Sequence, residues 1–342
     1  MSLIVLTNQD DWTCCMREVA HLDISYTKEY VSLYAEREGG VPEAVFFSEG
    51  EERIFYPYVV RSLDSFLPGY SDIVSIGYGG PSLCSKQSVV QSFSAQFHAY
   101  CQSKKYVTET VRFHPLLKNA ELFRDQMQLD LVRETIAVDV RPSLAQIQAQ
   151  YSQNVRRNMK KAKDHAVRIV EGKSNHDLAA FISLYRETME RNHAGASYYY
   201  DNPFFAGLLQ ETALCKPRLL LAIHDDIAVA GAIMLCGSRY AHFHLGASHT
   251  EDMPLGINHL LFDAMISLAK EDGLDYLLLG GGNQEQDGLF RFKASFTKDA
   301  PYPYWMGKRV HDEEVYQVLC EQNRADDAGS STFFPAYRAW GK

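Results

Sequence analysis

The chain has 342 residues, 46% of them hydrophobic, and a formal net charge of −9. This length exceeds the needs of one ordinary core, so we expect two domains, and the acidic balance argues against a general nucleic-acid binder while allowing a local basic patch. The start of the sequence lacks the basic and apolar regions of a signal peptide, and no apolar run is long enough to cross a bilayer. The seven cysteines form no CxxC pair, which favours free thiols in a reducing compartment, so we expect a cytoplasmic protein.

The first part of the chain has the pattern of a mixed α/β domain over residues 1–133. Its glycine-marked stretch Gly77–Pro81 follows a short strand, and a helix then leads to a second strand that ends at His114 and Pro115. In chain order the pattern predicts helices from Asp10 or Asp11 to about Val19 and over 26–37, strands Ala44–Ser48, Arg53–Val60 and Asp72–Ile76, a helix over 87–103, and a strand Tyr106–Phe113.

The second domain is predicted over residues 134–342 and begins with alternating apolar residues. The pair Asp225 and Asp226 marks a hairpin turn. The pattern predicts a strand around 136–140, a helix over 143–163, a strand Val167–Val170, a helix opened by the capping box Ser174–Asp177, hairpin strands Leu219–Ile223 and Ile227–Leu235, a strand Tyr240–Ala247, a helix over 256–271, and a buried strand Leu274–Leu279.

The end of this second domain indicates a functional site. A helical crossover joins Tyr240–Ala247 to Leu274–Leu279, so these strands should be parallel neighbours. Ligands of open α/β sheets bind at the carboxyl ends of such strands. A triple glycine, Gly280–Gly282, follows the second strand, and Lys293 comes soon after it between Phe292 and Phe296.

Several motifs in a fixed order resemble the Fem family of peptidoglycan-bridge aminoacyltransferases and the wider group of tandem GNAT proteins. The matching stretches are IGYGGP at 76–81, RFHPLLKN at 112–119, NVRRNMKKA at 154–162, LYRETMERNHA at 184–194, SYYYDNPFF at 197–205, HLGASHTEDMPLGINHLL at 244–261 and GLFRFKASF at 288–296.

This resemblance implies an α/β (α+β) fold of two tandem GNAT-like domains. Each domain should be a mixed, mainly antiparallel sheet with splayed parallel strands flanked by helices. The implied activity is transfer of an aminoacyl or acyl group to an amine of a cell-envelope precursor, peptidoglycan or a surface polysaccharide. The implied partners are the donor, this acceptor and, peripherally, other enzymes of envelope biosynthesis.

Two departures from the family pattern leave the donor open between aminoacyl-tRNA and acyl-CoA. No long helical arm is present in the sequence, and the glycine-rich loop Q/R-x-x-G-x-G/A typical of acetyl-CoA binding is missing. The equivalent loop, Met253–Asn258, has one glycine, which weakens the cradle of backbone N–H groups that pyrophosphate requires. We expect no tightly bound cofactor.

Lys293 and Phe292 are the predicted catalytic residues. By resemblance, the Phe-Lys motif places the lysine where it stabilises the oxyanion of a tetrahedral intermediate. The alternative is a solvated lysine whose stem lies on Phe292 and Phe296. The thiols have no adjacent histidine motif, so a cysteine nucleophile is not expected.

A basic segment is the candidate phosphate-binding surface. Arg156, Arg157 and Lys160 are predicted to bind tRNA or a nucleotide-linked acceptor, with Lys161, Lys163 and Arg168 close by. The alternative is a solvated helix face, the usual form of a charge run.

The remaining predicted substrate-binding residues are Gly79, Tyr199, His244, Gly281 and Asn283. The first four are expected to line a cleft between the two domains together with Lys293. His244 lies at a strand end, and a metal site at His242, His244 and His249 is not expected because no carboxylate or cysteine partner has a suitable spacing.

Two other hypotheses stay open beside transfer of an aminoacyl group. The first is an acyl-CoA-dependent N-acetyltransferase acting on an amino sugar. The second is a non-catalytic module that binds nucleotide sugars.

Overall fold

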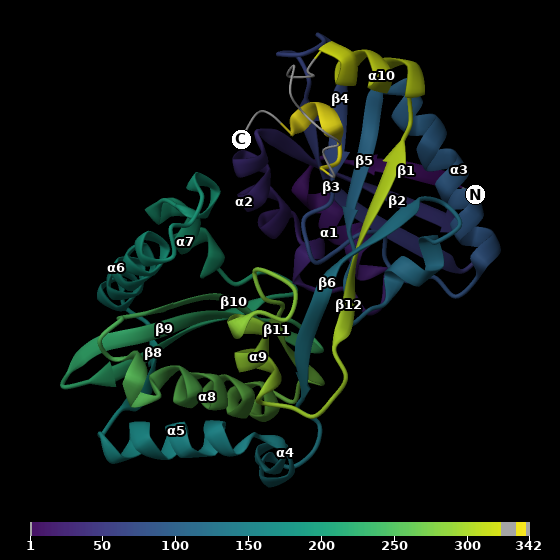
Figure 1. The fold of residues 1–342 in the computed structure, drawn as a ribbon. Coiled ribbons are helices and arrows are strands. Elements are labelled where there is room, and N and C mark those ends of the chain that lie inside the picture. Colours follow the sequence, from purple (N-terminus) through teal and green to yellow (C-terminus); the bar gives the residue numbers. More distant parts are fainter. Residues whose placement is uncertain (1, 323–332, 340–342) are drawn as a thin grey trace. The chain divides into compact units, whose positions relative to one another are not determined.

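The computed structural model describes residues 2–322 and 333–339. Contacts between Cα atoms divide the chain into two compact units (Figure 1). Unit 1 contains the described residues up to Val132 and those from Pro303 onward, and unit 2 is Arg133–Tyr302. The segment that begins at Pro303 therefore groups with the N-terminal part of the chain, whereas the division made from the sequence places it in the C-terminal domain.

Unit 1 is built on a mixed sheet with the strand order β1-β2-β3-β4-β5-β12. Neighbouring strands are antiparallel except β4 and β5, which are parallel and joined by α3. The elements are β1 Ser2–Leu6, α1 Gln9–Arg17, η1 Ile24–Tyr26, α2 Lys28–Glu38, β2 Gly40–Glu49, β3 Glu52–Ser62, β4 Ser71–Val74, α3 Gln87–Ser103, β5 Tyr106–Arg112, η2 Asn119–Phe123, β12 Tyr302–Val310, α10 Glu313–Gln322 and η5 Ala336–Arg338.

Unit 2 repeats this plan, with the strand order β6-β11-β10-β9-β8-β7. Here β10 and β11 are the parallel pair, and α8 is the crossover between them. The elements are β6 Gln128–Asp139, α4 Leu144–Gln150, α5 Gln153–Asp164, β7 Arg168–Gly172, α6 Asn175–Arg191, η3 Ala196–Tyr198, α7 Asn202–Leu208, β8 Lys216–His224, β9 Ile227–Cys236, β10 Tyr240–Ser248, η4 Met253–Leu255, α8 Ile257–Glu271, β11 Tyr276–Gly280 and α9 Gly288–Ala294.

Helices cover both faces of the sheet in unit 2. Figure 1 shows α6 and α7 on one face and α5 and α8 on the other. The apolar stripe of α8 includes Leu261 and Met265, both buried, and the core that it joins also contains Val155 and Ala162 from α5. These positions recur at helical spacing, so each of the two helices presents one apolar face to the core.

The parallel strands of unit 2 separate after a short paired stretch. Tyr240, Ala241 and His242 pair with β11, the last of them opposite Leu278. Beyond this point the pairing of β10 among the described residues is with β9, and its register shifts between Phe243 and Leu245. The predicted parallel pair and its helical crossover are therefore confirmed, and the two strands diverge toward their carboxyl ends.

Some predicted elements differ in the structure. The helix predicted over 143–163 is two helices, α4 and α5, because Ser152 starts a new helix by capping Val155 N–H. Strands β1 and β12 were not predicted from the sequence. The longest helices among the described residues have 17 residues, so that part of the chain carries no long helical arm, as predicted. No helix in the described ranges is both long enough and apolar enough to cross a membrane.

Candidate active site

Lys293 is buried at the point where the parallel strands of unit 2 diverge. Its side chain belongs to α9 and is 5% exposed. The ammonium Nζ donates a hydrogen bond to the carbonyl of Gly281, 2.7 Å away, directly after β11. It also lies 5.5 Å from the ring centroid of Phe243, the residue of β10 that follows the last paired position. The lysine is thus not the solvated surface residue of the alternative interpretation.

The surroundings of Lys293 lower the pKa of its ammonium group. Burial lowers the pKa of the ammonium to about 8, Asp287 acts in the opposite direction, and Arg133 lowers it further. At pH 7 the group is therefore still mainly charged. A mainly charged ammonium held in a site with little water is suited to stabilising a developing oxyanion.

The loop after β11 holds two of the predicted substrate-binding residues. Gly281 accepts the lysine bond, and the backbone N–H of Asn283 donates to Asp287, with a 2.7 Å separation. Asp287 also caps α9 by accepting from the N–H of Phe290. The structure therefore brings Lys293, Gly281 and Asn283 into one small region, with Asp287 as a residue that the sequence did not single out.

His244 and Phe292 lie near this region on neighbouring elements. His244 is the extra residue at the register shift of β10, and burial together with His242 lowers its pKa, so the ring is neutral at pH 7. Phe292 packs its ring on α8, with ring centroids 4.9 Å from Phe262 and 5.0 Å from His259. Phe292 thus fixes α9 against the core beside the lysine, and the roles assigned to both residues stay predictions.

Five of the six cations of the basic segment lie on the exposed face of α5, and the sixth, Arg168, is the first residue of β7. Val155, Met159 and Ala162 are buried on the other face, so the charged side chains point outward. Lys161 Nζ donates to the carbonyl of Pro254, 2.8 Å away, in the loop that leads into α8. The exposed residues of the segment are Arg156, Arg157, Lys160, Lys161, Lys163 and Arg168.

Two of these arginines donate hydrogen bonds to residues in or directly before α5. Arg156 donates to the carbonyl of Tyr151 at 2.6 Å, and Arg157 to the side-chain oxygen of Asn154 at 2.8 Å. Each guanidinium has further N–H donors, so the segment keeps the capacity to bind phosphate.

The tyrosine tract divides into a packed residue and exposed residues. Tyr200 stacks on Phe204, with ring centroids 4.1 Å apart. Tyr198 and Tyr199 are 55% and 43% exposed. Tyr199 is therefore available for stacking on a ligand, and its predicted role in substrate binding stays a prediction.

Gly79 lies in unit 1 and has its backbone groups engaged there. Its N–H donates to the carbonyl of Arg112 at 2.8 Å, and its carbonyl accepts from the side chain of Asn119 at 2.8 Å. A Cβ at this position would lie 2.7 Å from the carbonyl oxygen of Ile76, so the tight turn explains the glycine. That Gly79 contacts substrate stays a prediction, as does one cleft lined by all of these residues.

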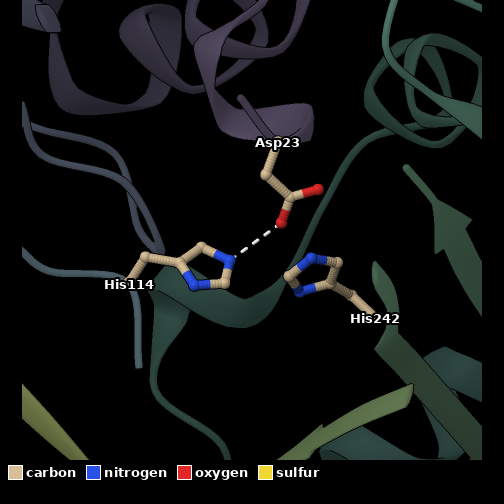
Figure 2. A group of neighbouring side chains, drawn as sticks. All are labelled: Asp23, His114 and His242. Atoms are coloured by element: carbon tan, nitrogen blue, oxygen red, sulfur yellow. Dashed lines mark hydrogen bonds and ion pairs between the residues drawn. The ribbon is translucent and has the colours of Figure 1, made fainter. Parts of the chain in front are cut away.

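Unit 1 also contains a buried pair that the sequence did not predict. His114 Nε2 donates to Asp23 at 2.8 Å (Figure 2). The backbone N–H groups of Leu116 and Leu117 both donate to His114 Nδ1, which places the proton on Nε2. Asp23 lies far from His114 in the sequence, so no local spacing reveals this pair.

Comparison by sequence identifies one domain. Residues 149–294 match the family described as an acetyltransferase (GNAT) domain. This range contains α5, the parallel strands and Lys293. A sequence search among curated proteins finds no match.

Comparison by structure extends the similarity over nearly the whole chain. The crystal structure of FemX aligns with a TM-score of 0.71 and 11% identity over 93% of this chain and 99% of FemX. The C-terminal domain of a putative lysylphosphatidylglycerol synthetase from Agrobacterium fabrum aligns with a TM-score of 0.57 and 13% identity over 90% of this chain and 93% of its own. L-PGS from Bacillus licheniformis aligns with a TM-score of 0.57 and 13% identity over 92% and 96%.

These similarities confirm a Fem-like tandem GNAT fold, as predicted from the ordered motifs. At these identities the structural likeness shows the fold alone. The matched acetyltransferase domain supports a role as an acyltransferase.

Proposed function

We propose that the protein is an N-acyltransferase that moves an aminoacyl or acyl group to an amine of a cell-envelope precursor. The observation that carries the proposal is the buried ammonium of Lys293 at the divergence of β10 and β11 inside a GNAT-type domain. A buried, mainly charged lysine that has no direct ion pair among the described residues is costly, and such groups concentrate at functional sites.

The proposed reaction is a direct transfer. The acceptor nitrogen attacks the donor carbonyl carbon, a C–N bond forms, and the carbonyl π electrons move to oxygen. Lys293 stabilises that oxyanion. The C–O bond of an ester donor, or the C–S bond of a thioester, then breaks; the leaving oxygen or sulfur takes a proton, and the attacking nitrogen releases one. An activated donor already reacts readily with an amine, so positioning the two reactants supplies much of the remaining effect.

The basic segment favours a donor or acceptor rich in phosphate. Its exposed cations flank the loop that leads into α8, to which Lys161 is bonded. The loop itself carries Glu251 and Asp252 and one glycine, Gly256, so it lacks a cradle of backbone N–H groups for pyrophosphate. Binding along the exposed face of α5 therefore fits an RNA backbone better than the compact pyrophosphate of a coenzyme, and the name lysylphosphatidylglycerol synthetase given to one neighbour denotes an aminoacyl product.

The second candidate is an N-acetyltransferase that uses acyl-CoA and acts on an amino sugar. The match of residues 149–294 to an acetyltransferase domain favours it. Both candidates use the same lysine and differ in the donor.

The test is a parallel assay of both donors. Purified protein is incubated with labelled aminoacyl-tRNA or with labelled acetyl-CoA, in each case with nucleotide-linked peptidoglycan precursors or amino-sugar acceptors, and label in the acceptor is measured. We expect transfer from aminoacyl-tRNA that is lost in Lys293→Met. Transfer from acetyl-CoA alone would establish the second candidate, and binding of nucleotide sugars without transfer from either donor would refute an enzymatic role.

A further inference from the structure

Lys293 binds a carbonyl of the loop Gly280–Asp287. Two side chains of opposite charge, those of Asp287 and Arg133, hold this loop in place. Asp287 accepts three backbone hydrogen bonds, from the N–H groups of Asn283 at 2.7 Å, Gln284 at 3.1 Å and Phe290 at 2.8 Å. These bonds connect the loop to the start of α9. They fix the helix that carries Lys293 relative to the loop whose carbonyl accepts the hydrogen bond of the lysine.

Arg133 holds the same loop from β6. Its Nη1 donates to the carbonyl of Gly282 at 2.6 Å. The loop approaches so closely that side chains are excluded: a Cβ at Gly281 would lie 2.7 Å from the carbonyl oxygen of Glu134, and one at Gly282 would lie 2.1 Å from a carboxylate oxygen of Asp287. We call this arrangement of Arg133, Asp287 and the loop the clamp. It leaves no room for a side chain at Gly281 or Gly282, which gives the triple glycine a physical reason beyond an ordinary turn.

The two clamping residues also act on Lys293 electrostatically, with opposite sign. Asp287 favours the charged ammonium and Arg133 disfavours it. Among the described residues, β10 contributes the uncharged ring of Phe243 to the same ammonium. Burial changes the pKa of Lys293 more than either neighbour does, and Asp287 and Arg133 shift it further in opposite directions.

We propose that Arg133 and Asp287 are positioning residues that hold the loop after β11 so that the carbonyl of Gly281 lies against the ammonium of Lys293. The catalytic role of Lys293 rests on the function proposed above. The clamp is a property of the folded chain and is measurable without any substrate.

The experiment measures the pKa of Lys293 directly. Full-length protein is prepared with lysine labelled with ¹³C at Cε, the Lys293 signal is assigned by its absence in Lys293→Met, and its pKa is read by NMR titration in three variants. Arg133→Met keeps the aliphatic contact with the loop and removes the charge, Asp287→Asn keeps the shape and removes the opposite charge, and Lys298→Met is the control because Lys298 is an exposed cation a short distance along the chain. We expect the pKa of Lys293 to rise in Arg133→Met and to fall in Asp287→Asn, each by on the order of half a unit, and to stay unchanged in the control.

Turnover supplies the second measurement. Both clamp variants should lower kcat and leave the KM of donor and acceptor little changed, and Arg133→Lys should recover part of the loss because it restores the charge and a donor. Shifts of the same sign in both variants, or none in variants whose melting shows a folded protein, would overturn the clamp. Normal turnover in Lys293→Met would instead refute the proposed catalytic role while leaving the measured pKa shifts as a separate result.

Discussion

Replacing Lys293 by methionine tests the proposed chemistry most directly. The variant keeps the aliphatic length of a side chain that is 5% exposed and removes its charge. Loss of one preorganised donor to an oxyanion costs on the order of 3 kcal/mol of transition-state stabilisation, so turnover should fall about 10²-fold or more. Because the interaction belongs to the transition state, the KM of donor and acceptor should change little.

The pH dependence of turnover follows from the same residue. The pKa of Lys293 is lowered to about 8, so the charged form is present below this pH and is lost as the pH rises through it. Turnover in the unmodified protein should therefore decline above pH 8, and in Lys293→Arg this decline should move to higher pH because an arginine stays charged.

The assay is acceptor labelling under saturating donor, with melting temperature as the check on folding. Lys298→Met, which removes an exposed charge nearby, serves as the matched control and should keep normal turnover. The reasoning is refuted by a folded Lys293→Met protein with near-normal kcat. A variant that loses only affinity for the acceptor would place the lysine in substrate binding.

Three further predictions concern unit 2. Changing Arg156, Arg157 and Lys160 to alanine should weaken binding of an RNA donor and lower the slope of log K against log salt by up to about three, measured by titration at several salt concentrations; an unchanged slope would make the segment a solvated face. Gly256→Ala should lower the free energy of unfolding by on the order of 2 kcal/mol, measured by chemical denaturation. The reason is that Gly256 has φ +82° and that a Cβ would lie 2.4 Å from a backbone oxygen of α5. A variant of unchanged stability would show that α5 moves to accommodate the methyl group. Burial lowers the pKa of His259 below its usual 6.5, so the unfolded chain binds more protons and stability is lost as the pH falls below about 6.5. His259→Leu should reduce the fall in melting temperature between pH 7 and pH 5, and an identical fall would show that other groups dominate.

The sequence predicted those features that local pattern controls. The stripe of α8 and the alternation in the strands depend on side chains a few residues apart, so the parallel pair around Tyr240 and Leu277 was accessible from spacing alone. The edge strand β1 was missed because Ser2–Leu6 is too short and too evenly apolar to show a period. Strand β12 was missed because its partner, β5, lies far away in the sequence.

The candidate site was only partly accessible for the same reason. Lys293 was found through its motif and Gly281 through the triple glycine, since both signals are local. Arg133 and Asp287 were missed because their function depends on backbone groups of other segments, and ordinary charged residues that bond to the backbone leave no pattern in the sequence. Their contribution to the site can be recognised only from the folded conformation of the loop after β11.

The two units differ in how the chain continues beyond the parallel strand pair. In unit 1 the chain after β4 returns to β5: the N–H of Ser75 bonds to the carbonyl of Thr110, the N–H of Gly79 bonds to that of Arg112, and Gly79 forms a parallel bridge with Phe113. These bonds occupy the inner edge of β5 along its carboxyl end. In unit 2 the ladder between β10 and β11 ends at His242 and Leu278, and the buried Lys293 contacts Phe243 directly beyond that point. The proposed donor therefore fits unit 2 better than unit 1, because the corresponding stretch of β5 is bonded to the backbone of unit 1 itself.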